Sequence, residues 1–329
     1  MVRPALLTGL TLCLLPVYSW AAAPRVVADI APLHSIVAQV MNGVGQPDLL
    51  VQPGASPHSY SLRPSEAEAL AQAEVVFWIS EDLSPWLESP LENLASSAHK
   101  VEMLDLSATV GHPFREGATF ESHAHGDEDN HNEHHDEHEE HEEHEEHEEH
   151  EEHHHGEYDP HAWLDPMNAK VWAGEIAQVL SSTDPSNAEI YQKNAQAFQD
   201  SVEELTGSLS ERADRLNGIR FIVFHDAYQY FERRFGLPAA GAIALSDASD
   251  PSPARIREIQ TLVSELGVTC AFTEPQYNPG LVDTVFEGSS VNTIGVMDPL
   301  GADIKIGTGH YTELLKRLMA SLEQCQPQP

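Results

Sequence analysis

Short apolar runs alternate with helix-like patterns along the first 105 residues of the chain. Four apolar runs have the length of strands: RVVADI from Arg25, DLLVQ from Asp48, EVVFWI from Glu74 and KVEML from Lys100. Three candidate helices lie between them, beginning near Pro32, Pro64 and Pro85. Proline suits the first turn of a helix, where a missing N–H costs nothing. This order predicts a mostly parallel sheet covered by helices, that is, an α/β lobe.

The same alternation resumes after Gly218 and continues to the C-terminus. Its apolar runs are RFIVF from Arg220, GAIAL from Gly241, VTCAFTE from Val268 and VNTIGVM from Val291. Its candidate helices are one that ends near Arg234, two that begin at Pro253 and Pro279, and a last one from His310. The pattern predicts a second α/β lobe over residues 218–329.

A long amphipathic pattern separates the two α/β regions. Asp184 is a suitable N-cap and Pro185 a suitable first helical residue. One apolar stripe follows at helical spacing: Ala188, Tyr191, Ala195, Phe198, Val202, Leu205, Leu209 and Leu216. We expect a helix over residues 184–217 that links an N-terminal lobe, residues 24–183, to the second lobe. A long core helix would show the same stripe.

The N-terminus has the features of a secretory signal peptide. Arg3 precedes an apolar run from Ala5 to about Val17, and Ala21, Ala22 and Ala23 follow. The run is too short for a permanent transmembrane helix, so residues 1–23 are predicted to be removed on export to the periplasm. A buried N-terminal helix is the alternative. An exported chain would retain Cys270 and Cys325, for which a disulfide is expected and two free buried thiols are the alternative.

Charge excludes some partners and marks one segment. The chain has 17 basic and 53 acidic residues, which argues against affinity for nucleic acid or anionic lipid. Residues 121–157 hold 18 acidic residues and 13 histidines. Such a segment lacks the apolar side chains needed for a core, so we expect a disordered loop that binds metal ions weakly at several places. A solvating spacer is the alternative.

Outside that segment, three histidines occupy positions that favour a binding site. His58 lies in the Pro/Gly/Ser-rich loop PGASPHSYSLRPSE, His161 lies in YDPHAWLDP, and His225 follows the strand FIVF directly. Ligands of α/β proteins bind where the loops after strands converge. Asp298 also follows an apolar strand, and three imidazoles with one carboxylate make a four-coordinate zinc shell. A catalytic zinc site is arranged in a similar way, although Glu274 is the one candidate base near these loops.

Several motifs together resemble the ZnuA-type zinc-binding proteins, a branch of the metal-specific solute-binding proteins that serve ABC importers. They are GASPHSYSLRPSEA, DPHAWLDP, FHDAYQYFERRFGL, the TEPQ of residues 273–276, the DPLG of residues 298–301 and the acidic histidine segment between the first two.

The resemblance implies two lobes joined by a long rigid helix, with Zn²⁺ bound in the cleft by His58, His161 and His225. It places a second-lobe disulfide at Cys270 and Cys325. Some zinc-binding members have an acidic residue just before the first histidine, where this chain has Pro57. The fourth ligand is therefore open among Asp298, water and a loop histidine, with Asp298 the first choice.

The function that follows is high-affinity capture of Zn²⁺ in the periplasm and delivery to the membrane permease of a zinc ABC transporter. No enzymatic activity is expected, and the chain is expected to be monomeric. The alternatives are a zinc-dependent hydrolase, a periplasmic zinc buffer without a transporter, and a surface adhesin.

Overall fold

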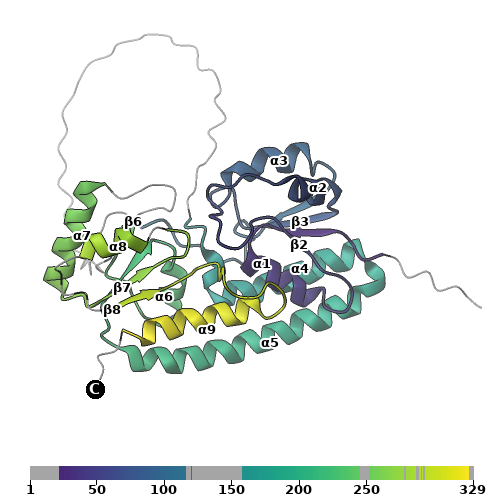
Figure 1. Ribbon diagram of the computed structural model, residues 1–329. Helices are drawn as coiled ribbons and strands as arrows, with labels where there is room; N and C mark the ends of the chain where they lie inside the picture. Colours follow the sequence, from purple (N-terminus) through teal and green to yellow (C-terminus); the bar gives the residue numbers. More distant parts are fainter. Residues whose placement is uncertain are drawn as a thin grey trace, which may run out of the picture.

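Two four-stranded parallel sheets, one in each half of the chain, form the framework of the protein in the computed structural model (Figure 1). The structure describes residues 22–115, 120, 158–244, 252–277, 279–286, 289, 291 and 293–325. The predicted α/β fold class with mostly parallel sheets is confirmed. Residues 1–21 of the predicted signal peptide and the acidic histidine segment, residues 121–157, lie outside the described part.

The first sheet has the strand order β2-β1-β3-β4, and all its pairings are parallel. Its strands are β1 (Val26–Ala28), β2 (Asp48–Leu49), β3 (Val75–Trp78) and β4 (His99–Glu102). The helices between them are α1 (Ala31–Val40), α2 (Pro64–Gln72) and α3 (Glu88–Asn93), the last preceded by a 3₁₀ turn at Pro85–Leu87. β1 and β3 are buried along their whole length, as expected for central strands covered on both faces.

The second sheet has the order β6-β5-β7-β8 and is also parallel throughout. Its strands are β5 (Phe221–His225), β6 (Gly241–Ala244), β7 (Cys270–Thr273) and β8 (Thr293–Val296). The helices of this lobe are α6 (Gln229–Phe235), α7 (Pro253–Leu266), α8 (Pro279–Phe286) and α9 (His310–Glu323).

A layer of long helices runs along one side of both sheets. α4 (Pro166–Thr183) is followed by a 3₁₀ turn at Pro185–Asn187 and then by α5 (Ala188–Ala213). α5 passes beneath both lobes and packs against α1, α4 and α9 (Figure 1). The predicted stripe is buried from Tyr191 to Leu209, which confirms the long helix. Asp184 starts the 3₁₀ turn instead of α5, and its carboxylate accepts hydrogen bonds from Ser186 and Asn187.

The predicted disulfide is present between Cys270 on β7 and Cys325 just after α9. It closes a loop of 55 residues and fastens the last helix to the second sheet. Among the described residues, no helix has the length and apolar character to span a bilayer. The boundaries 24–183, 184–217 and 218–329 stay predictions, because the helix layer contacts both lobes.

Candidate metal site

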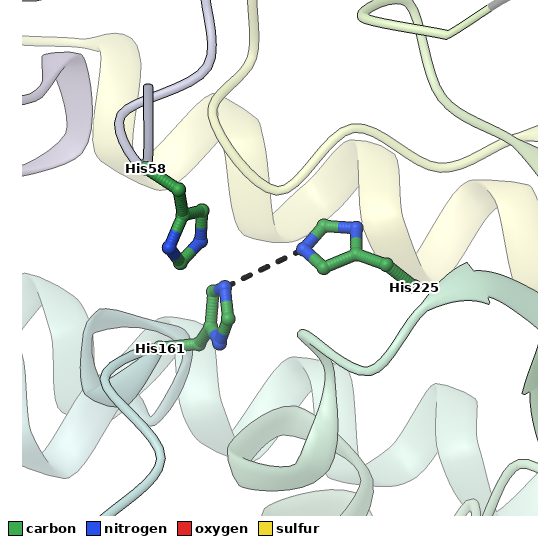
Figure 2. A group of neighbouring side chains, drawn as sticks. All are labelled: His58, His161 and His225. Carbon is green, nitrogen blue, oxygen red and sulfur yellow. Dashed lines mark hydrogen bonds between the residues drawn. The ribbon is translucent and has the colours of Figure 1, made fainter. Parts of the chain in front are cut away.

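His58, His161 and His225 come together between the two lobes, each brought there by a different element. His58 lies in the loop between β2 and α2, His161 just before a 3₁₀ turn at Ala162–Leu164, and His225 is the last residue of β5. One ring nitrogen from each lies within 4.8 Å of the other two, and Figure 2 shows the rings converging. Among the described residues this is the group of His, Cys, Asp and Glu side chains that can hold a metal ion.

Buried carboxylates orient two of the imidazoles. Nδ1–H of His161 donates to Oδ1 of Asp159 over 2.6 Å, and Nδ1–H of His225 donates to Oε1 of Glu274 over 2.7 Å. Burial raises the pKa of Asp159 to about 7 and also raises the pKa of Glu274. Because Nδ1 of each ring is bonded to a carboxylate, Nε2 carries the lone pair and faces the site, in the orientation that metal-binding histidines adopt.

The distance between these nitrogens fits a tetrahedral metal. Nε2 of His161 and Nε2 of His225 are 3.4 Å apart (Figure 2). Metal–nitrogen bonds of about 2.0–2.1 Å at tetrahedral angles separate two ligand nitrogens by about 3.3–3.4 Å. Two lone pairs at this distance repel each other, and a cation bound between them removes that repulsion.

The loop that carries His58 is fastened through the residue before it. The carbonyl oxygen of Pro57 accepts hydrogen bonds from Ser84 Oγ over 3.2 Å and from Trp86 Nε1 over 2.6 Å. The His58 ring lies 5.4 Å from the His161 ring, centroid to centroid. Pro57 therefore contributes to the site by positioning its neighbour, since it has no side-chain ligand atom.

The structure does not bring Asp298 into this group. Its carboxylate accepts three backbone N–H hydrogen bonds, from Leu300 and Gly301 over 2.9 Å each and from Ala302 over 2.6 Å. Asp298 thus closes the turn after β8, as aspartate often does in turns. Its assignment as the fourth ligand stays a prediction, and it requires the carboxylate to leave these donors.

Arg115 connects the first lobe to the second beside the site. Its guanidinium donates to both oxygens of Asp226, the residue after His225, and to both oxygens of Glu232 on α6. It also lies over the ring of Phe120, 3.6 Å from the centroid. Arg115 is thus the cation that compensates two buried carboxylates at the point where the acidic histidine segment begins.

The described residues that flank that segment pair with each other. Pro113 and Tyr158 form an isolated antiparallel bridge, and the N–H of Asp159 donates to the carbonyl oxygen of His112 over 2.8 Å. The hydroxyl of Tyr230 on α6 donates to the carbonyl oxygen of Asp159 over 2.7 Å. We call residues 111–115 with residues 158–159 the stem. The stem joins the segment to the residue that orients His161.

Three residues near the site were not identified from the sequence: Asp159, Arg115 and Gln276. Asp159 stands two residues before His161, and an aspartate at that spacing before a histidine was an available signal for an orienting carboxylate. Arg115 had no comparable signal, because its partners come from the other lobe. Gln276 belongs to the TEPQ motif, but the motif alone did not indicate that its side chain lines the same pocket as the three histidines.

The fold and the site define a protein of two α/β lobes with a group of three histidines between them that could hold a metal ion. The sequence matches the family described as "Zinc-uptake complex component A periplasmic", ZnuA, over residues 26–325. It is 46% identical over 306 residues to the high-affinity zinc uptake system protein ZnuA of Brucella abortus, covering 92% of this chain and 91% of that protein. It is 43% identical over 328 residues to the corresponding Paracoccus denitrificans protein, with 99% of both chains covered.

Solved structures agree on the fold. A crystal structure of ZnuA superposes with a TM-score of 0.72 at 20% identity, covering 93% of this chain and 100% of that one. The chain therefore belongs to the ZnuA family of periplasmic zinc-uptake components.

Proposed function

We propose that this protein captures one Zn²⁺ ion in the periplasm with His58, His161 and His225 and delivers it to the membrane permease of an ABC importer. The observation that carries this proposal is the convergence of three imidazoles, two of them oriented by buried carboxylates. Membership of the zinc-uptake family supports the same conclusion.

The ligand chemistry favours zinc over hard cations. Neutral imidazole suits Zn²⁺ and other late transition metals, whereas Mg²⁺ and Ca²⁺ prefer oxygen ligands. Asp159 and Glu274 do not themselves bind the ion, but their negative charge reaches it through the hydrogen-bonded rings. These two carboxylates therefore partly neutralise the positive charge of a Zn²⁺ ion bound at this buried site.

The position of Glu274 supports binding and not hydrolysis. This residue was the candidate base for a zinc hydrolase. One of its oxygens accepts from both Nδ1–H and the backbone N–H of His225, and the residue is buried. These two hydrogen bonds give Glu274 a role in orienting a ligand histidine, which a binding site requires.

Export and delivery complete the proposal. Residues 1–23 serve as the signal peptide that directs the chain to the periplasm, where the family operates. The partner is the permease of a zinc ABC transporter, and the protein acts as a monomer. The acidic histidine segment collects ions at weak sites near the tight one.

Calorimetric titration of the mature, chelator-stripped protein tests the proposal. We expect one tight zinc site and further weak ones, and deletion of the gene should impair growth when zinc is limiting. A single class of weak sites would contradict a structured site between the lobes. Tight binding without any growth effect would contradict the role in import.

A further inference from the structure

The walls of the metal cavity offer few groups that can interact with a fourth ligand. Besides the three histidines, the described residues that line it are Pro57, Trp163, Gln276, Pro299 and Leu300. The indole N–H of Trp163 already donates to the carbonyl oxygen of Pro299 over 2.8 Å. In this lining, Gln276 is thus the one side chain other than the imidazoles that presents a hydrogen-bond acceptor.

The acceptor of Gln276 is buried and has no partner among the described residues. Its Oε1 is out of contact with solvent and receives no hydrogen bond there. Buried polar atoms in folded proteins are nearly always hydrogen-bonded, so an unpaired acceptor in a ligand cavity points to a partner that arrives with the ligand.

The turn after β7 holds Gln276 in a fixed position. Two residues earlier, Glu274 accepts the hydrogen bond from His225, and the N–H of Tyr277 donates to the carbonyl oxygen of Glu274 over 3.2 Å. The ring of Tyr277 stacks on that of Phe224, with 3.9 Å between centroids and 19° between planes. One turn therefore carries both the carboxylate that orients His225 and a second residue, Gln276, that lines the same cavity.

Zinc with three imidazoles takes a fourth ligand to complete its tetrahedron. An amide oxygen is a weak direct ligand for this metal, but a zinc-bound water is a strong hydrogen-bond donor that needs an acceptor in an enclosed cavity. The carboxylate of Asp298 already has three backbone donors.

We propose that Gln276 positions the fourth zinc ligand, a water molecule, by accepting its hydrogen bond on Oε1. This inference rests on the proposed function of the three-histidine site.

A water in this position leaves one coordination site exchangeable. All protein ligands are then neutral imidazoles, and an incoming ligand can displace the water without first breaking a protein–metal bond. An importer's acceptor site can begin to take over the ion at this position. A carboxylate there would hold the ion more tightly and slow its transfer.

Cobalt substitution tests the inference, because Co²⁺ enters tetrahedral zinc sites and its visible absorption reports the ligands. In the wild-type protein, added azide should displace the water and shift the cobalt bands. Gln276→Met should retain one metal per chain but weaken zinc binding about tenfold and alter the cobalt bands. Gln276→Glu keeps the acceptor and adds a negative charge beside the bound water, so it should tighten zinc binding and weaken the response to azide.

Asp298→Asn distinguishes the two candidates for the fourth position, and under this inference it should retain the wild-type response to azide. The inference is overturned if azide leaves the wild-type spectrum unchanged while Asp298→Asn gains a response, because Asp298 would then be the ligand. It is also overturned if Gln276→Met matches the wild type in spectrum and affinity. If the wild-type protein binds neither Co²⁺ nor Zn²⁺ tightly, the proposed function itself fails. The azide test on the wild-type protein does not depend on whether any variant folds.

Discussion

Buried histidines occur in two regions of this protein, and their ring nitrogens have different partners. At the metal site, His161 and His225 donate from Nδ1 to carboxylates and direct Nε2 into a shared space. Where α1 meets α9, His34 and His310 bond through Nε2 to the carbonyl oxygens of Pro47 and Leu300, over 3.0 and 2.7 Å.

The difference shows how the second partner of an imidazole determines its use. A carboxylate on Nδ1 strengthens the ring as a donor to metal and compensates positive charge. A backbone carbonyl on Nε2 is a neutral partner, and among the described residues neither His34 nor His310 belongs to a group that could hold a metal ion. The proposed ligands His161 and His225 are thus as buried as His34 and His310, but their ring nitrogens have different partners.

Removing one of the proposed ligand histidines should have the largest effect on zinc affinity. His161→Ala or His225→Ala should weaken zinc binding more than a hundredfold, about 2.8 kcal/mol, because one of three protein–metal bonds is lost. The control His34→Gln should leave affinity within about twofold. Competition with a fluorescent zinc chelator measures both, and an unchanged constant for His161→Ala would refute the ligand assignment.

Removing an orienting carboxylate should have a smaller effect. Asp159→Asn and Glu274→Gln should each weaken zinc binding by about 10- to 100-fold, since the amide can present N–H to the ring and favour the wrong tautomer. Glu203→Gln, on the exposed face of α5, is the control. Equal affinities for all three variants would mean that the carboxylates serve only the fold.

The buried histidines His34 and His310 should make the stability of the protein depend on pH. Burial lowers the pKa of His34 and of His310 below the ordinary value of 6.5. As pH falls below 6.5, these two histidines are protonated in the unfolded chain but stay neutral in the folded chain. Their protonation therefore stabilises the unfolded chain and lowers the free energy of unfolding. Each contributes a slope of at most about 1.4 kcal/mol per pH unit.

Urea unfolding of metal-free protein between pH 7.5 and 5.5 measures this contribution. His34→Gln should show a shallower loss of stability on acidification than the wild type, because glutamine does not titrate. Comparing the two proteins cancels the opposite contribution of Asp159, whose raised pKa favours the folded state as pH falls. Identical slopes would show that His34 has the same pKa in both states.

Deleting residues 122–154 should have the smallest effect on the tight site. The three ligands, their carboxylates and the stem all lie outside the deletion, so the tight constant should change less than about twofold, while the weak sites disappear. A chelator titration of full-length and deleted protein decides it. A loss of tenfold, about 1.4 kcal/mol, would mean that a histidine of the segment completes the shell.

The sequence was sufficient for most of the fold because its signals are local. Proline begins or directly precedes several helices, including α2, α4 and α7, and the apolar runs coincide with the strands. Two cysteines in an exported chain indicated the disulfide between Cys270 and Cys325.

The geometry of the site was harder to predict from the sequence, because it depends on contacts between residues far apart in the chain. The three histidines were identified as candidates by their motifs and their positions at strand ends. Whether a carboxylate after a strand reaches a metal or closes its own turn depends on the next few backbone N–H groups, and for Asp298 the structure shows the second arrangement. Gln276 could not be inferred without the cavity, and Arg115 could not be inferred without its partners in the other lobe.

The stem has a consequence for how the protein can evolve. Pro113 and Tyr158 pair with each other, so described residues on the two sides of the segment lie close together. The entropy cost of closing a loop grows slowly, by about 0.6 kcal/mol for each doubling of its length. Insertion or deletion of Glu-Glu-His triplets should therefore change the free energy of folding only slightly. Under the proposed function, a change in the number of triplets would change the number of weak metal sites and leave the proposed tight site as it is.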